Sequence, residues 1–78
     1  MKEQILAMLK ELQPEYDFEE SVDFILRGYL DSFDVVTLVT ELEQAFSISI
    51  SALDIVPENF ASVNSICELV KHSKKINF

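Results

Sequence analysis

Hydrophobic positions repeat at helical spacing in three segments of this chain, and the pattern between these segments is irregular. Near the N-terminus apolar residues recur three or four apart, and Pro14 disfavours helix at the residue before it, so the sequence predicts a helix over 2–12. The clearest pattern predicts a second helix over 32–46, where five apolar residues form one stripe along a face. These five residues are Val35, Leu38, Val39, Leu42 and Phe46.

A third helix is predicted near the C-terminus, after Ser62, whose hydroxyl can accept from a free N–H group of the first turn. We expect this helix to fray over 72–75, and we expect Pro57 to begin a short helix before it. The chain is therefore predicted to be all-α, with three main helices and one short helix. The face of the last helix that is expected to be buried carries Val63, Ile66, Cys67 and Val70.

Two segments between the helices lack a helical period. Residues 14–30 mix carboxylates with apolar side chains, which predicts a long loop pinned by its apolar residues and holding one helical turn. Residues 47–51 alternate like a strand, but no second alternating segment is available to pair with them. We therefore expect an extended linker in which Ile48 and Ile50 are turned inward.

The composition is that of a folded chain, because 49% of its 78 residues are apolar and it has only one Gly and two Pro. This length supports one small core, so we expect a single domain over 1–78. Fourteen acidic residues against six basic ones give a formal net charge of −8. Such a surface makes nucleic acid and anionic membranes poor partners and a basic protein surface a good one. The simpler interpretation is that the acidic surface only aids solubility.

The chain offers little for catalysis, metal binding or disulfides. One cysteine, Cys67, and one histidine, His72, form neither an internal disulfide nor a zinc site, and their spacing on a helix sets the two side chains apart. We expect Cys67 in the core and His72 exposed, with no catalytic residue and no metal. The longest apolar run, 5–9, is far too short to span a bilayer, and no leader opens the chain. We expect a cytoplasmic protein without membrane insertion.

The informative segment is G-Y-L-D-S-F-D at 28–34, at the start of the second helix. Asp31 suits the N-cap, and Ser32 follows it at the positive end of the helix. A phosphate attached to the Ser32 hydroxyl would meet free backbone N–H groups and the helix dipole. Local chemistry alone favours the simpler interpretation that Ser32 is a helix-start residue, since serine is common there.

A resemblance to the acyl carrier protein family extends across nearly the whole chain. It rests on G-x-L-D-S-F-D, then V-x-L-V-x-x-L-E-x-x-F, I-x-I and D-I-x-P-E-N-F-x-S-V before the last apolar helix. The chain is most similar in outline to standalone bacterial carrier proteins. The resemblance implies an acyl-carrier-like bundle of three main helices plus one short helix, and a covalent 4′-phosphopantetheine on Ser32. It implies a carrier that holds its cargo as a thioester and is not itself an enzyme.

The sequence departs from the fatty-acid type at positions that resemble the face read by partner enzymes. Phe33 stands where that type usually has leucine, and Thr37 and Thr40 stand where it tends to have glutamate and methionine. The cognate enzymes are therefore expected to differ from those of bulk fatty-acid synthesis. We expect Asp31 and Phe33 to flank the cofactor on Ser32. The residues expected to contact partner enzymes are Asp34, Val36, Thr37, Thr40 and Glu43.

The resemblance also implies the partners of a monomeric carrier. These are a phosphopantetheinyl transferase, an acyl- or aminoacyl-loading ligase, and an acyltransferase or synthase with a basic docking surface. Two cargoes stay open, a fatty or polyketide-type acyl group and a D-alanyl or other aminoacyl group. The competing hypothesis from another class is an acidic helical interaction module that carries no prosthetic group.

Overall fold

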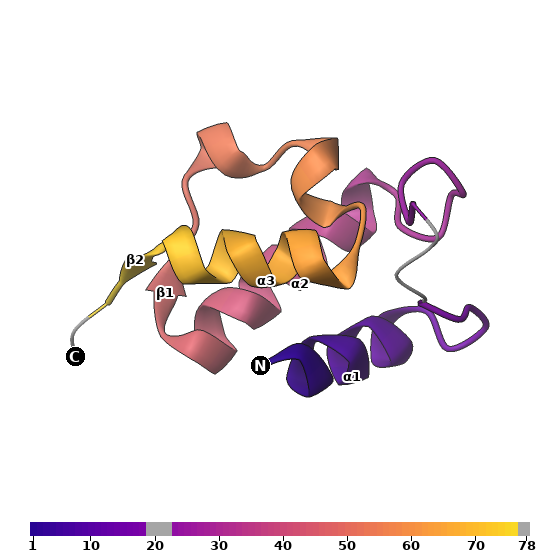
Figure 1. The fold of residues 1–78 in the computed structure, drawn as a ribbon, viewed down its shortest axis with the longest axis horizontal. Coiled ribbons are helices and arrows are strands. Elements are labelled where there is room, and N and C mark those ends of the chain that lie inside the picture. The colour runs from indigo at the N-terminus through magenta and orange to yellow at the C-terminus, as the bar shows by residue number, and fades with distance from the viewer. Residues whose placement is uncertain (19–22, 77–78) are drawn as a thin grey trace.

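Three α-helices pack around one hydrophobic core in the computed structural model, which describes residues 1–18 and 23–76 (Figure 1). The helix α1 packs against both α2 and α3, and two short 3₁₀ helices lie in the connection between α2 and α3. The elements are α1 (Lys2–Leu12), α2 (Ser32–Phe46), β1 (Ile48–Ser49), η1 (Ala52–Asp54), η2 (Pro57–Phe60), α3 (Val63–His72) and β2 (Lys74–Lys75). The predicted all-α class and the predicted bounds of the first two helices are confirmed.

Local capping signals explain where the later helices begin. Pro57 occupies the first turn of η2, where its missing N–H costs nothing. The Ser62 hydroxyl accepts from the backbone N–H of Ser65 at 3.1 Å and so caps α3. The helix ends at His72, which is exposed as predicted and pairs with Glu68 one turn earlier.

The segment after α2 is a strand with a partner, so the prediction of an unpaired linker was wrong. Ile48 lies opposite Lys75 in an antiparallel pair, within the segment predicted to fray. Two lysines carry no alternating apolar signal, and the pairing depends on backbone groups alone. Ser47 adopts φ 52 at the end of α2 and turns the chain toward this pair. Ile48 and Ile50 are both buried, which confirms that they turn inward.

The core draws on all three helices and on the loops between them. On α2 the centre of the apolar stripe is buried, whereas Val35 and Phe46 are half-buried at its edges. On α3 the buried face includes Leu69, and Cys67 is half-buried beside it. Cys67 therefore packs against the core rather than lying within it, which corrects the prediction. The fully buried side chains of largest volume are Phe24, Phe60, Ile5, Leu9, Leu38, Leu42, Ile48, Ile66 and Val63.

The connection between α1 and α2 is a loop pinned by aromatic side chains, as predicted. Tyr16 stacks on Tyr29 with ring centroids 4.3 Å apart, and Phe18 meets Phe24 edge to face at 4.9 Å. A turn follows at 23–28, and the part of the predicted loop at 19–22 lies outside the described residues. In Figure 1 this loop lies at the end of the molecule opposite β1 and β2.

Two further observations concern only the described ranges, 1–18 and 23–76. In these ranges no helix combines the length and the hydrophobicity that crossing a bilayer requires. Over the same residues, no three His, Cys, Asp or Glu side chains gather closely enough to hold a metal ion.

Candidate functional site

Reciprocal hydrogen bonds between two aspartates define the N-terminus of α2. Asp31 Oδ1 accepts from the backbone N–H of Asp34 at 2.8 Å, and Asp34 Oδ2 accepts from the backbone N–H of Asp31 at 3.3 Å. This capping box satisfies two backbone donors and sets the direction in which the chain enters the helix. Ser32 is the first residue of α2, lies between the two aspartates and is exposed. The predicted N-cap at Asp31 is confirmed.

The first turn of α2 presents backbone donors beside the Ser32 hydroxyl. Asp34 N–H donates to the Asp31 side chain, and Val35 N–H donates to the Asp31 carbonyl at 3.0 Å. The amides of Ser32 and Phe33 precede that first helical bond and face the N-terminal end of the helix. An anionic group on Ser32 would therefore lie next to two amide donors and the positive end of the helix dipole.

Asp34 is buried, whereas the sequence predicted an exposed docking charge. Its side chain is 9% exposed and accepts from Gln13 Nε2 at 2.9 Å in addition to its bond with Asp31. The physical reason lies in the helical period, because Asp34 is one turn before Leu38 on the side of α2 that faces the core. Asp31 and Phe33, the sequence neighbours of Ser32, are both exposed.

Glu43, also predicted as a docking charge, has a structural contact. Its Oε2 accepts from the backbone N–H of Ile50 at 2.9 Å, and the side chain is half-buried. Ile50 follows β1, beyond the two residues that pair with β2, so its amide needs an acceptor from elsewhere. Glu43 therefore contacts the backbone of another part of the chain, whereas the sequence predicted a free surface charge.

The remaining predicted docking residues, Val36, Thr37 and Thr40, lie on α2 close to Phe33. Phe33 is 80% exposed and Val36 is 62% exposed, so two apolar side chains on the first turns of this helix face solvent. Thr40 is exposed and Thr37 is half-buried. Each threonine hydroxyl donates to a carbonyl one turn earlier on α2, at 3.2 Å in both cases, so this part of the surface is less polar than the sequence indicates.

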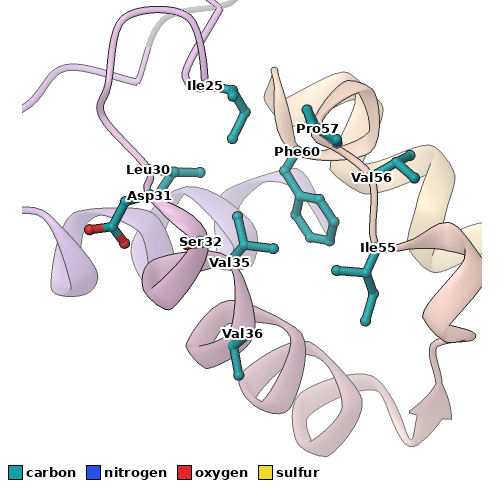
Figure 2. A pocket seen from close by; sticks show the side chains of 10 residues that line it. All are labelled: Ile25, Leu30, Asp31, Ser32, Val35, Val36, Ile55, Val56, Pro57 and Phe60. Atoms are coloured by element: carbon teal, nitrogen blue, oxygen red, sulfur yellow. The ribbon is translucent and has the colours of Figure 1, made fainter.

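A mostly apolar cavity of about 350 Å³ opens beside Ser32, between the start of α2 and the segment before α3. Figure 2 shows Val35 from α2 and Ile55 and Phe60 from that segment converging on the cavity, while the carboxylate of Asp31 points away from it. Sequence analysis identified neither this cavity nor Gln13. Their parts lie far apart in the chain, and only the packing of the helices brings them together.

Comparison with known proteins assigns the chain to a family. The family described as "Phosphopantetheine attachment site" matches residues 3–70, and the chain belongs to this family. The protein is accordingly a phosphopantetheine carrier, with 4′-phosphopantetheine attached covalently to a serine. The predicted carrier role and cofactor are confirmed.

Several relatives of this chain bear the name D-alanyl carrier protein. The protein of that name from Lactococcus lactis subsp. lactis (strain IL1403) is 34% identical over 79 residues, covering 99% of this chain and 100% of the relative. The Staphylococcus xylosus protein is 31% identical over 72 residues, covering 90% of this chain and 92% of the relative. The Bacillus cereus (strain B4264) protein is 34% identical over 67 residues, covering 83% and 85% respectively. No solved structure matches.

The residues at the start of α2 fit the cofactor of this family. A phosphodiester needs an exposed hydroxyl and donors for its oxygens, and Ser32 is exposed in the first turn of α2, where backbone amides lack helical partners. Ser32 also lines the apolar cavity, so part of an attached arm or its cargo has a surface to contact.

Proposed function

We propose that Ser32 is the serine that carries 4′-phosphopantetheine and that the chain delivers a thioester-bound group between enzymes. The observation that supports this most is the exposed Ser32 hydroxyl inside the capping box at the start of a fifteen-residue helix. Ser62 begins the other capped α-helix after a loop, but its hydroxyl is half-buried and donates to Ser65 Oγ at 3.0 Å. Ser32 therefore offers the more accessible nucleophile and the better site for an anion.

In the proposed reaction a phosphopantetheinyl transferase supplies the catalysis and this chain supplies the acceptor. The Ser32 oxygen gives its proton to a base of the transferase and forms a bond to the phosphorus of the pantetheine phosphate of coenzyme A. The bond from that phosphorus to the bridging oxygen breaks, and the nucleotide bisphosphate leaves with this oxygen. The amides of Ser32 and Phe33 face the new phosphodiester, and the exposed Asp31 carboxylate is available to cationic groups of the transferase. When bound, the cofactor supplies a thiol that holds the cargo as a thioester.

The carrier itself is proposed to be non-catalytic, with its chemistry done by enzymes that dock on it. A flexible arm on one small protein raises the effective concentration of the cargo at each successive active site. The partners are a transferase, a loading ligase and an acyltransferase or synthase, and we place the carrier in the cytoplasm with its source of coenzyme A.

For the cargo, the first candidate is D-alanine or another small aminoacyl group. The relatives that bear the name D-alanyl carrier protein cover nearly the whole of this chain, which supports that candidate. The second candidate is an acyl chain, which the apolar cavity beside Ser32 supports. Incubation of the modified protein with ATP and a D-alanine-activating ligase, or with a fatty-acid-activating one, distinguishes them by the mass that is added.

The docking face proposed for these enzymes is the exposed side of α2 next to Ser32, made of Phe33, Val36, Thr37 and Thr40. Any enzyme that reaches the Ser32 hydroxyl must cover the neighbouring turn of this helix. Apolar side chains form its centre, and Asp31 supplies a charge at its rim. We therefore expect partners that present an apolar surface with basic residues around it.

The attachment site is tested by intact mass after treatment with a phosphopantetheinyl transferase and coenzyme A. The mass should rise by one phosphopantetheine in the native chain and in Ser62→Ala, the matched helix-start control. Ser32→Ala should show no rise. A modified Ser32→Ala variant would contradict the assignment to Ser32, and an unmodified native chain would favour the acidic interaction module.

A further inference from the structure

A polar contact joins the end of α1 to the start of α2, and it involves a residue far from the attachment motif. Gln13 is the C-cap of α1, where its backbone N–H donates to the Leu9 carbonyl at 2.9 Å. Its side-chain Nε2 donates to Asp34 Oδ2 at 2.9 Å, across 21 positions of sequence. One residue thus ends one helix and contacts the first turn of the next.

Asp34 needs this donor because its carboxylate is buried. Among the residues that the structure describes, Asp34 is the one charged side chain in the buried class. Burial of a carboxylate is costly unless hydrogen bonds replace its lost hydration. Asp34 Oδ2 receives two such bonds, from Gln13 Nε2 and from the backbone N–H of Asp31. The position of the carboxylate is therefore set by both donors together.

The bond from Gln13 to Asp34 bears on Ser32 because Asp31 and Asp34, which precede and follow Ser32 in the chain, are hydrogen-bonded to each other. The backbone of Asp31 donates to the oxygen that Gln13 holds, and the backbone of Asp34 donates to the Asp31 side chain. Apolar packing of α1 on α2 is not directional, and it tolerates small rotations of α2 about its axis. The hydrogen bond from Gln13 is directional and opposes such rotations.

We infer that Gln13 is a positioning residue for the modification of Ser32, an inference that rests on the proposed attachment at Ser32. Gln13 holds the Asp34 carboxylate and, through it, the turn that presents the Ser32 hydroxyl to the transferase. It lies outside the proposed docking face, so the effect should fall on the rate of transfer within the complex rather than on its formation.

The test compares Gln13→Glu with Gln4→Glu, which makes the same chemical change at an exposed site of α1. Gln13→Glu places a second carboxylate against Asp34 in place of a donor. The rate of modification is measured under single-turnover conditions over a range of transferase concentrations, at a temperature where circular dichroism shows each variant folded. We expect the maximal rate to fall roughly tenfold for Gln13→Glu, which corresponds to about 1.4 kcal/mol. The half-saturating transferase concentration and the Gln4→Glu rates should stay within about twofold of the native values.

The variant Leu12→Ala separates positioning from general stability. Leu12 is a partly buried residue of α1 next to Gln13, so its truncation lowers stability and leaves the donor to Asp34 in place. We expect the maximal rate of Leu12→Ala to stay within about threefold of the native value. A native rate in Gln13→Glu, or an equal loss of rate in Gln13→Glu and Leu12→Ala, would overturn the inference. Failure of the attachment proposal has a different signature, since Ser32→Ala would then still be modified.

Discussion

Replacing Glu43 by Ala removes the acceptor of the Ile50 amide and tests whether this glutamate is structural. In the native chain Glu43 Oε2 accepts from Ile50 N–H at 2.9 Å and connects α2 to the residue that follows β1. Ile50 is buried, so its amide has limited access to a water molecule when the carboxylate is gone. We therefore expect Glu43→Ala to lower the free energy of unfolding.

The magnitude follows from the type of bond and its exposure. A hydrogen bond to a charged group is worth about 1.5–3 kcal/mol, and a buried donor left without a partner costs about 1–3 kcal/mol. Because Glu43 is half-buried, water replaces part of the lost bond, and we expect a loss of about 1–2 kcal/mol. For a domain of this size that corresponds to a fall in Tm of roughly 5–15 °C. Glu43→Gln keeps a carbonyl acceptor and should lose less than half as much.

The assay is reversible thermal and urea unfolding followed by circular dichroism. Glu11→Ala is the control, because it removes the same charge from an exposed site on α1 and relieves the net charge of −8 equally. A change in overall repulsion would affect both variants alike, whereas loss of the Ile50 contact affects only one. If the two variants unfold within about 1 °C of each other, the contact contributes nothing measurable and Glu43 is available for docking after all.

Two further predictions concern the walls and the rim of the site. Phe60 is fully buried and lines the cavity beside Ser32, so Phe60→Ala should lower the free energy of unfolding by about 3–5 kcal/mol in urea titrations. A loss below about 1 kcal/mol would show that the segment before α3 is loosely packed. Phe33→Ala should change stability by less than about 0.5 kcal/mol and yet lower kcat/KM for the loading ligase, since Phe33 is 80% exposed. Leu26→Ala, at an 85% exposed position, is the control, and equal kcat/KM values for the two variants would argue against the docking face.

Local signals in the sequence determined the helices and the place of the candidate site. The spacing of apolar residues, three or four positions apart, predicted the bounds of α1 and α2, because residues at this spacing lie on the same face of a helix. Asp31, Pro57 and Ser62 marked helix starts by chemistry that acts within three or four residues. Ser32 was singled out by the resemblance of the surrounding motifs to the acyl carrier protein family, because local chemistry alone favoured a simple helix-start residue.

Tertiary structure determined which polar residues are buried and which form hydrogen bonds to distant parts of the chain. Asp34 lies three residues after Asp31, a spacing that fits a capping box, but its burial and its bond to Gln13 depend on how the end of α1 meets α2. Glu43 and Gln13 became structural for the same reason, since each bonds to a group in another element.

The pairing of β1 with β2 depended on tertiary structure as well, because backbone hydrogen bonds between distant segments leave no period in the side chains. The cavity beside Ser32 is bounded by parts of the chain that meet only when the segment before α3 folds back onto α2. Periodicity and capping report on a residue and its near neighbours, whereas burial and long-range hydrogen bonds depend on which elements come together.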